Sequence, residues 1–293
     1  MKTRLLALAT LALTMAACSN DDENNNQPTA RFSAEIHDAT LTRAAGTSWH
    51  GNDEIGITAT GNEAMKQYSN VKYTTANGDG NFTGSPIYFQ DDNTVTFTAY
   101  YPFKGTEGTA AGTLENNTKT QTTEYQKGID YLFAKAENKS CNDANVTFNF
   151  HHKMSQITLT FVNDGNDTNI SDITVYTISG LKMEGTFNTA DGTATAKAEE
   201  SAENLTIEGI PGLSGDEAEV APVILYPQSA ANVTLTVILD GQDYSCELDI
   251  KDEELKAGNN YTFDITVSKT GLAVQKSGIE SWNPVEGNGT ATM

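Results

Sequence analysis

Apolar and polar residues alternate with a period of two along most of the chain after residue 30. The clearest case is Val95, Phe97, Ala99 and Tyr101, whose neighbours are mostly threonines. Successive side chains of a strand point to opposite faces, so this pattern indicates strands with one buried face. The segments that show it are residues 32–38, 94–101, 146–150, 157–161, 233–239, 244–250 and 261–267.

Short clusters of Gly, Asn, Asp and Thr separate these segments, as in antiparallel sandwiches. Asp240 and Gly241 lie between two of the segments, and this dipeptide is typical of a tight β-hairpin. A helical period is found only in Asp252–Ala257. The pattern therefore predicts an all-β protein.

The number of strands bears on the number of domains. About seven or eight strand segments precede residue 150 and about as many follow it, which is enough for two β-sandwiches. The sequence between them has no linker rich in Pro or Ser that would mark the boundary. We place the boundary near His151. We expect an N-terminal sandwich over residues 31–150 and a C-terminal sandwich with a tail over residues 151–293.

The N-terminus has the features of an export signal. Lys2 and Arg4 precede an uncharged run over residues 5–17, shorter than the roughly 20 apolar residues that span a bilayer. Small residues end this run at Ala17, directly before Cys18. A lipoprotein signal peptidase requires this arrangement beside the thiol that becomes acylated. We expect a signal peptide over residues 1–17, cleavage between Ala17 and Cys18, and a lipid on Cys18.

A polar segment follows the predicted lipid. Residues 18–30 are rich in Asn and acidic residues and cannot bury apolar area, so they predict a solvated tether. Asp21, Asp22 and Glu23 resemble the acidic signals that send lipoproteins of some bacteria to the outer face of the outer membrane. A plain flexible spacer is the alternative.

The charge of the chain excludes one class of partner. The formal net charge is -21, and loss of Lys2 and Arg4 with the signal peptide makes the mature chain more acidic still. Such a surface repels nucleic acid and anionic lipid. We therefore expect no binding to nucleic acid, although acidity alone identifies no partner.

The two cysteines beyond Cys18 differ in their surroundings. Cys246 shares its alternation with Tyr244 and Leu248, which predicts a buried strand face, whereas Cys141 lies in a polar segment over residues 138–145. An oxidising compartment would permit a disulfide between them. Their positions do not support one.

Catalytic and metal-binding patterns are weak. His151 and His152 are adjacent, and adjacent strand residues point to opposite faces, so a structural role is favoured over a shared metal. Asn52, Asp53 and Glu54 fit a turn better than a calcium loop. A nucleophile elbow, a phosphate loop or a dinucleotide fingerprint is not found. We expect neither an enzyme nor a cofactor.

A series of short motifs runs in a specific order along nearly the whole chain. The motifs cover residues 42–44, Trp49, 51–57, 97–102, 130–134, 150–155, 255–258, 261–263 and 279–282. Together with the lipoprotein signal and the acidic tether, this order resembles the fimbrillin-like proteins, the subunits of type V pili. Each motif is short, and the resemblance depends on their order.

The resemblance implies a pair of transthyretin-like β-sandwiches in an outer-membrane lipoprotein precursor. In this family an arginine-specific protease cleaves after an arginine near the first strand. Here the cut would fall between Arg43 and Ala44, where the small residues 44–47 favour a mobile, cleavable backbone. Arg31 suits cleavage less well, because it stands at the beginning of the predicted strand itself.

The resemblance also implies a mode of assembly. Cleavage removes the first strand, and a strand from another subunit fills the groove that is left. Phe32, Ala34 and Ile36 would form the apolar face of the removed strand. A donor is expected from the segment after residue 268, in which Leu272 and Val274 alternate with less apolar neighbours.

The resulting hypothesis is a non-enzymatic fimbrial subunit or fimbrial adhesin precursor. Its expected partners are other pilus subunits, the outer membrane through the lipid, and a ligand on a host or bacterial surface. The alternative is a glycan-binding surface lipoprotein. The placement of Trp and Tyr separates the two, because a glycan binder needs exposed aromatic rings whereas a pilin needs them in its core.

Overall fold

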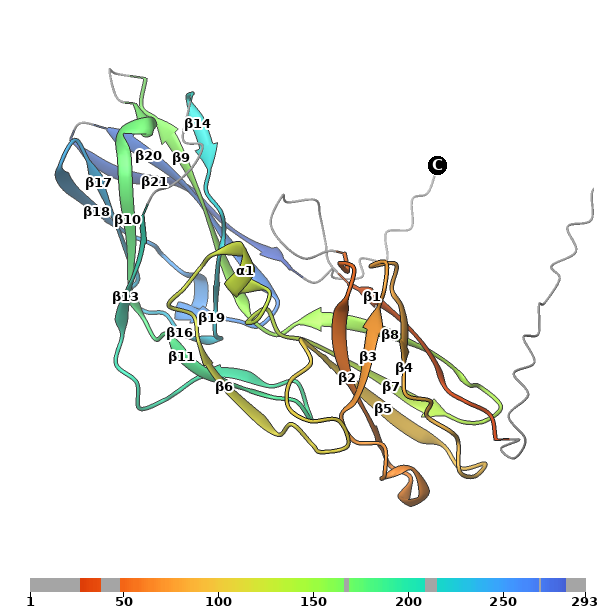
Figure 1. Ribbon diagram of the computed structural model, residues 1–293. Coiled ribbons are helices and arrows are strands. Elements are labelled where there is room, and N and C mark those ends of the chain that lie inside the picture. The colour runs from red at the N-terminus through yellow and green to blue at the C-terminus, as the bar shows by residue number, and fades with distance from the viewer. Residues whose placement is uncertain (1–26, 38–47, 166–168, 209–214, 269, 283–293) are drawn as a thin grey trace, which may run out of the picture.

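The computed structural model describes residues 27–37, 48–165, 169–208, 215–268 and 270–282 (Figure 1). Strands dominate the regular structure of these residues, and α1 is a helix of only four residues. The predicted all-β class is confirmed. The helices in the described part of the chain are all too short or too polar to cross a membrane.

The first unit is a closed sheet of seven strands in the order β1, β4, β3, β2, β5, β7 and β8. Inward side chains from alternate positions fill it, as the period-two pattern predicted. The strand β1 completes the closure by lying between β4 and β8. The bounds are β1 Arg31–Ile36, β2 Asp53–Thr60, β3 Val71–Thr75, β4 Asn81–Gly84, β5 Val95–Tyr101, β7 Leu132–Lys139 and β8 Asn145–His152.

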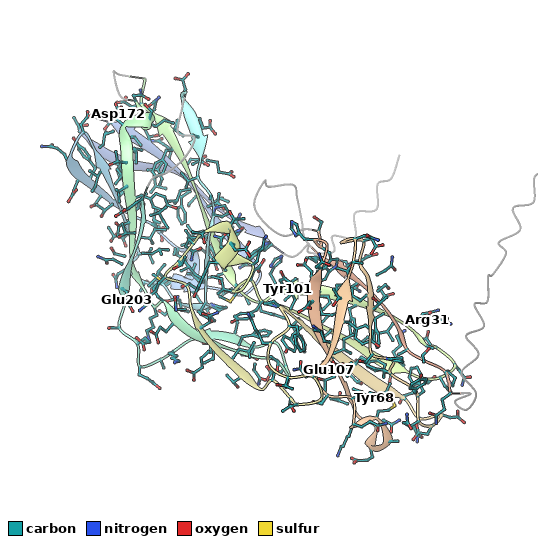
Figure 2. All side chains as sticks on the ribbon, in the orientation of Figure 1. Arg31, Tyr68, Tyr101, Glu107, Asp172 and Glu203 are labelled. Atoms are coloured by element: carbon teal, nitrogen blue, oxygen red, sulfur yellow. The ribbon has the colours of Figure 1, made fainter. Side chains whose placement is uncertain are left out.

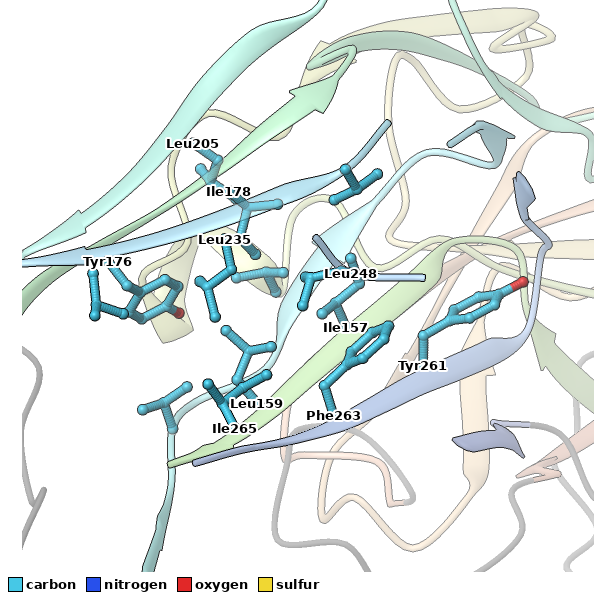
Figure 3. Packing of buried hydrophobic residues seen from close by; sticks show 14 of the residues in the cluster. Ile157, Leu159, Tyr176, Ile178, Leu205, Leu235, Leu248, Tyr261, Phe263 and Ile265 are labelled. Carbon is cyan, nitrogen blue, oxygen red and sulfur yellow. The ribbon is translucent and has the colours of Figure 1, made fainter. Parts of the chain in front are cut away.

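The second unit consists of two sheets that enclose a separate core. One sheet has the order β13-β10-β17-β18, and the other has the order β14-β9-β20-β21 with β15 also paired to β9. Ile178 and Leu235 of the first sheet pack against Ile157, Leu159 and Phe263 of the second (Figure 3). The bounds are β9 Ser155–Asn163, β10 Ile173–Leu181, β13 Glu203–Glu208, β14 Glu217–Glu219, β15 Val223–Leu225, β17 Thr234–Leu239, β18 Gln242–Glu247, β20 Asn259–Ser268 and β21 Gly271–Ser281.

A small third sheet connects the two halves of the chain. It has the order β12-β11-β6, with β6 at Thr113–Asn117, β11 at Glu184–Asn188 and β12 at Ala194–Ala196. After β6, the side-chain amide of Gln121 donates to the Ile224 carbonyl at 2.9 Å, and that of Gln126 in α1 donates to the Pro222 carbonyl at 2.7 Å. The segment between β5 and β7 therefore packs on the C-terminal half.

An apolar cluster forms the junction between the two units. The stacked rings of Tyr131 and Phe187, with centroids 4.4 Å apart, join residues from the two halves. The molecule is elongated, with Arg31 and Asp172 near its opposite ends and Tyr101 between them (Figure 2). The buried members of the cluster are Tyr100, Ile129, Tyr131, Phe133, Met154, Phe187, Ala194, Ile224, Tyr226 and Trp282.

The predicted hairpin at Asp240-Gly241 is confirmed between β17 and β18. Both residues have positive φ, 51° and 75°, as a two-residue hairpin of the favoured hand requires. On the strand that follows, Tyr244 and Cys246 are half-buried against the core, on the predicted face. The strand ends at Glu247, before the buried Leu248, so the predicted strand over residues 244–250 extends too far.

The helical reading of Asp252–Ala257 is wrong. Lys251–Glu253 forms one 3-10 turn, η3, and the next two residues form the short strand β19. Asp252 and Glu253 have positive φ, 62° and 51°, which a right-handed helix cannot contain. The remaining short elements are η1 Glu63–Met65, α1 Thr123–Gln126, η2 Ile170–Asp172, β16 Gln228–Ser229 and β19 Glu254–Leu255.

Candidate functional site around the closing strand

The strand β1 pairs very unequally with its two neighbours. It runs parallel to β8 over six residue pairs, from Arg31 opposite Asn145 to Ile36 opposite Phe150. It runs antiparallel to β4 over only two pairs, of which Phe32 opposite Phe82 lies in the core. β8 therefore sets the register of β1, and β1 is the element whose loss would give the closed sheet two free edges.

The inward face of β1 is apolar, as predicted. Ala30, Phe32 and Ala34 are buried, and Ile36 is half-buried against the same core. The outward positions Arg31 and Glu35 are exposed. Because successive strand residues alternate faces, this single strand both covers the core and presents a charged outer surface.

The ring of Phe32 lies in a pocket made of three aromatic rings. Its centroid is 4.9 Å from Tyr73 and 5.2 Å from Phe97, both edge to face, and 5.7 Å from Phe148, stacked. The Tyr73 hydroxyl donates to the Ser85 carbonyl at 2.7 Å. Burial raises the pKa of Tyr73 to about 12, because the apolar surroundings disfavour the ionised hydroxyl. Such aromatic contacts add to the transfer free energy of the ring.

The backbone of Ala34 is held on both sides. Its N–H donates to the Gly80 carbonyl at 2.8 Å, and its carbonyl accepts the indole N–H of Trp49 at 2.9 Å. Gly80 has φ of +77°, and a Cβ at this position would lie 2.4 Å from the Ala34 carbonyl oxygen. Only a glycine therefore lets β1 approach this closely.

The site residues predicted from the sequence, Ala17, Cys18, Arg43 and Ala44, lie outside the described residues. Lipidation and cleavage therefore stay predictions. The last described residue before Arg43 is His37, which follows β1. Its backbone N–H donates to the Phe150 carbonyl at 2.9 Å.

Two residues that hold β1 were not identified from the sequence. Trp49 was named only as part of a motif, and Gly80 lies in a Gly-Asp-Gly turn that looked like many others. The indole of Trp49 is buried among Phe82, Tyr101 and Phe150, with centroids 5.0–5.6 Å away. Its bond to Ala34 depends on pairing across the sheet, which a local pattern does not reveal.

The histidine pair has a structural setting. The His152 ring is buried, its Nδ1 lies 2.6 Å from the Asp130 carboxylate, and it stacks on Trp282. His151 points elsewhere, toward His37, with ring centroids 5.7 Å apart. Within the described residues, no group of three or more His, Cys, Asp or Glu side chains could hold a metal ion. Cys141 and Cys246 are free thiols.

Aromatic placement bears on the two functional hypotheses. Trp49 and Trp282 are 8% and 7% exposed. In the part of the chain that the structure describes, Ile279 is the only large hydrophobic residue that is exposed, at 41%. Both Trp rings thus lie in buried clusters, and no Trp, Tyr or Phe ring of the described residues is fully exposed.

The fold and the closing strand define an all-β protein whose first sheet is completed by the strand β1. Residues 42–282 match the family model described as fimbrillin-like, and the chain belongs to this family. The match begins after β1. A comparison with curated proteins gives no match.

Two solved structures are similar over most of the chain. One, described as a cell adhesion protein from Bacteroides ovatus, has 27% identity and a TM-score of 0.74, covering 89% of this chain and 100% of its own. The other, also described as a cell adhesion protein, is from Bacteroides uniformis, with 29% identity, a TM-score of 0.72, and coverage of 88% and 100%. Both descriptions concern cell adhesion and agree with the match to the fimbrillin-like family.

Proposed function

We propose that this chain is a fimbrial subunit or fimbrial adhesin precursor that assembles by replacement of β1 with a strand from another subunit. The observation that carries the proposal is the position of β1, which completes the closed sheet between β4 and β8. Two transthyretin-like units, an N-terminal lipid on Cys18 and cleavage between Arg43 and Ala44 are parts of the same proposal.

Loss of β1 would create a strong acceptor. The six backbone pairs along β8 would lose their partner, and the inward pocket of Phe32 would open to water. Burying one phenylalanine side chain stabilises by about 1.5–3 kcal/mol. Unpaired strand edges also capture extended segments. A strand with a matching apolar face would therefore be held both by burial of its side chains and by backbone hydrogen bonds to the free edge.

The distribution of basic residues supports cleavage at Arg43. The chain contains three arginines, Arg4, Arg31 and Arg43, and residues 44–293 contain fourteen lysines and no arginine. A protease specific for arginine could thus remove the segment before Ala44 without a second site in the body of the protein. Arg31 lies at the start of β1 and its N–H donates to the Ala144 carbonyl at 2.9 Å, which protects the backbone there.

Export and location follow from the same reading. The lipid on Cys18 would anchor the precursor in the outer membrane, and multiple acyl chains give stable anchoring where a single one does not. Because β1 begins thirteen residues after Cys18, the tether would hold the folded units close to the surface. The protein would then enter the fimbrium at the cell surface with other pilus subunits as partners.

The test is cleavage of the purified protein after Arg43, with its size followed by light scattering. Cleaved protein should form larger species, alone or with added subunits from the same cell. An Arg43→Ala variant treated with the same protease should stay at its original size. Cleaved protein that remains monomeric under both conditions would remove the case for a pilin.

A further inference from the structure

We infer that the groove occupied by β1 selects its replacement by side-chain pattern. The incoming strand must run parallel to β8, carry an aromatic ring at the Phe32 position and carry a small residue at the Ala34 position. Residues 271–293 of this chain lack that pattern, so we expect a segment other than these residues to supply the strand, from a different polypeptide. This inference rests on the proposed function and adds which kind of polypeptide donates the strand.

The aromatic requirement comes from the shape of the Phe32 site. Tyr73, Phe97 and Phe148 surround the ring on three sides at 4.9–5.7 Å, and all three are buried. An aliphatic or short side chain would leave the edge-to-face contacts unmade and a void in a core that packs closely. The pocket thus favours a flat aromatic ring at the Phe32 position over an aliphatic or short side chain.

The small residue is required two positions later. Ala34 is 3% exposed, and its backbone is held by the Gly80 carbonyl and by the indole N–H of Trp49. A larger side chain would push the strand away from both. The residue must also have an N–H, because the bond to the Gly80 carbonyl needs a donor, and this excludes proline.

Direction and register come from β8. The six parallel pairs with β8 outnumber the two antiparallel pairs with β4. A slip of one residue would turn the charged outer positions, such as those of Arg31 and Glu35, into the core. The pocket and the long edge therefore fix one alignment of the incoming strand.

The C-terminal segment does not satisfy these conditions. Residues 271–293 contain no Phe or Tyr, and their single aromatic residue is Trp282. Two positions after it stands Pro284, which lacks the N–H required opposite Gly80. Residues 271–281 are moreover paired along β20 as strand β21. The C-terminal segment of a second copy is therefore a poor donor.

The experiment uses the chain from Ser19 onward, labelled with a fluorophore at its N-terminus and cut after Arg43 so that the β1 fragment stays bound. Unlabelled peptides compete for the groove, and displacement is read as a fall in anisotropy. The native peptide covers residues 28–37, and its variants are Phe32→Ala, Ala34→Leu and, as an outward-facing control, Glu35→Ala. A tail peptide covers residues 270–285.

The native peptide and the Glu35→Ala peptide should displace the label at similar concentrations. The Phe32→Ala and Ala34→Leu peptides should need a concentration at least about ten times higher, a change that corresponds to only about 1.4 kcal/mol. The tail peptide should not compete. Equal competition by the Phe32→Ala peptide, or by the tail peptide, would overturn the selectivity while leaving strand replacement intact. Failure of the native peptide itself to displace the label would instead overturn strand replacement, and the selectivity with it.

Discussion

The imidazole of His152 stacks on the indole of Trp282, with ring centroids 3.9 Å apart and planes inclined by 11°. His152 ends β8, the strand that holds β1, and Trp282 directly follows β21. The Asp130 carboxylate lies 2.6 Å from the imidazole Nδ1 and orients the ring, and the backbone N–H of Trp282 donates to the Gly258 carbonyl at 2.7 Å. The stack thus fixes the start of the C-terminal tail against the junction of the two units.

Truncation of this stack should weaken the whole fold. Trp282→Ala should reduce the free energy of unfolding by about 3–5 kcal/mol, because a large buried ring is lost from the junction. Ile279→Ala, at a position 41% exposed near the same chain end, should cost less than about 1 kcal/mol. Denaturant unfolding of both variants measures the difference. Equal costs would mean that the stack contributes nothing beyond local packing.

The core of the second unit offers a test of strand register. Leu235 is fully buried opposite Ile178 and Cys246, whereas Thr234 points to the other face and is half-buried. Leu235→Ala should cost about 2–5 kcal/mol through lost burial and a cavity. Thr234→Ala should cost far less. If urea unfolding gave the same loss for both, the register of β17 would be incorrect.

A glycine pair tests how closely β1 must approach. Gly80 and Gly108 have nearly the same φ, +77° and +81°, but a Cβ at Gly80 would meet the Ala34 carbonyl at 2.4 Å and one at Gly108 would meet nothing within 4 Å. Both alanine variants should lose about 1–2 kcal/mol from the left-handed backbone.

Gly80→Ala should lose a further 1–3 kcal/mol or so from the clash with β1. It should also release the β1 fragment faster from the protein cut after Arg43. Matching stabilities and release rates for the Gly80→Ala and Gly108→Ala variants would show that this contact does not hold the strand.

Thiol reactivity should report the burial of Cys246. Desolvation raises the pKa of its thiol from 9.0 to about 11, and the thiolate is the reactive form. In a Cys141→Ser variant, alkylation at pH 8 should be slow in the native protein and fast in denaturant. The raised pKa also stabilises the fold below pH 9, and this contribution should be lost as pH rises through about 11. Rapid alkylation of native protein would contradict the placement of Cys246.

The strands with long alternating runs could be predicted from the sequence, because one buried face imposes a period of two. Phe32 and Ala34 were correctly assigned to one apolar face of the first strand for this reason. The strand β6, Thr113–Asn117, has Leu114 as its only large apolar residue and pairs with the distant β11. Its identity as a strand depends on that pairing, so no local pattern could indicate it.

The number of strands in the second half was underestimated for a related reason. Thirteen strands, β9 to β21, are found there among the described residues. Several have two or three residues, such as Gln228–Ser229 and Glu254–Leu255, which pair with each other. A period cannot be recognised over two residues. In the same way, the parallel pairing of β1 with β8 joins segments more than a hundred residues apart and was beyond a local reading.

The most direct measurement of strand removal is mass spectrometry of the N-terminus of the protein recovered from surface fibres. The assembled chain should begin at Ala44 and lack the residues of β1, Arg31–Ile36. Membrane-bound protein outside the fibres should begin at a lipidated Cys18. If the chains in the fibres were uncleaved between Arg43 and Ala44, and so still contained the β1 residues, replacement of the closing strand would be contradicted.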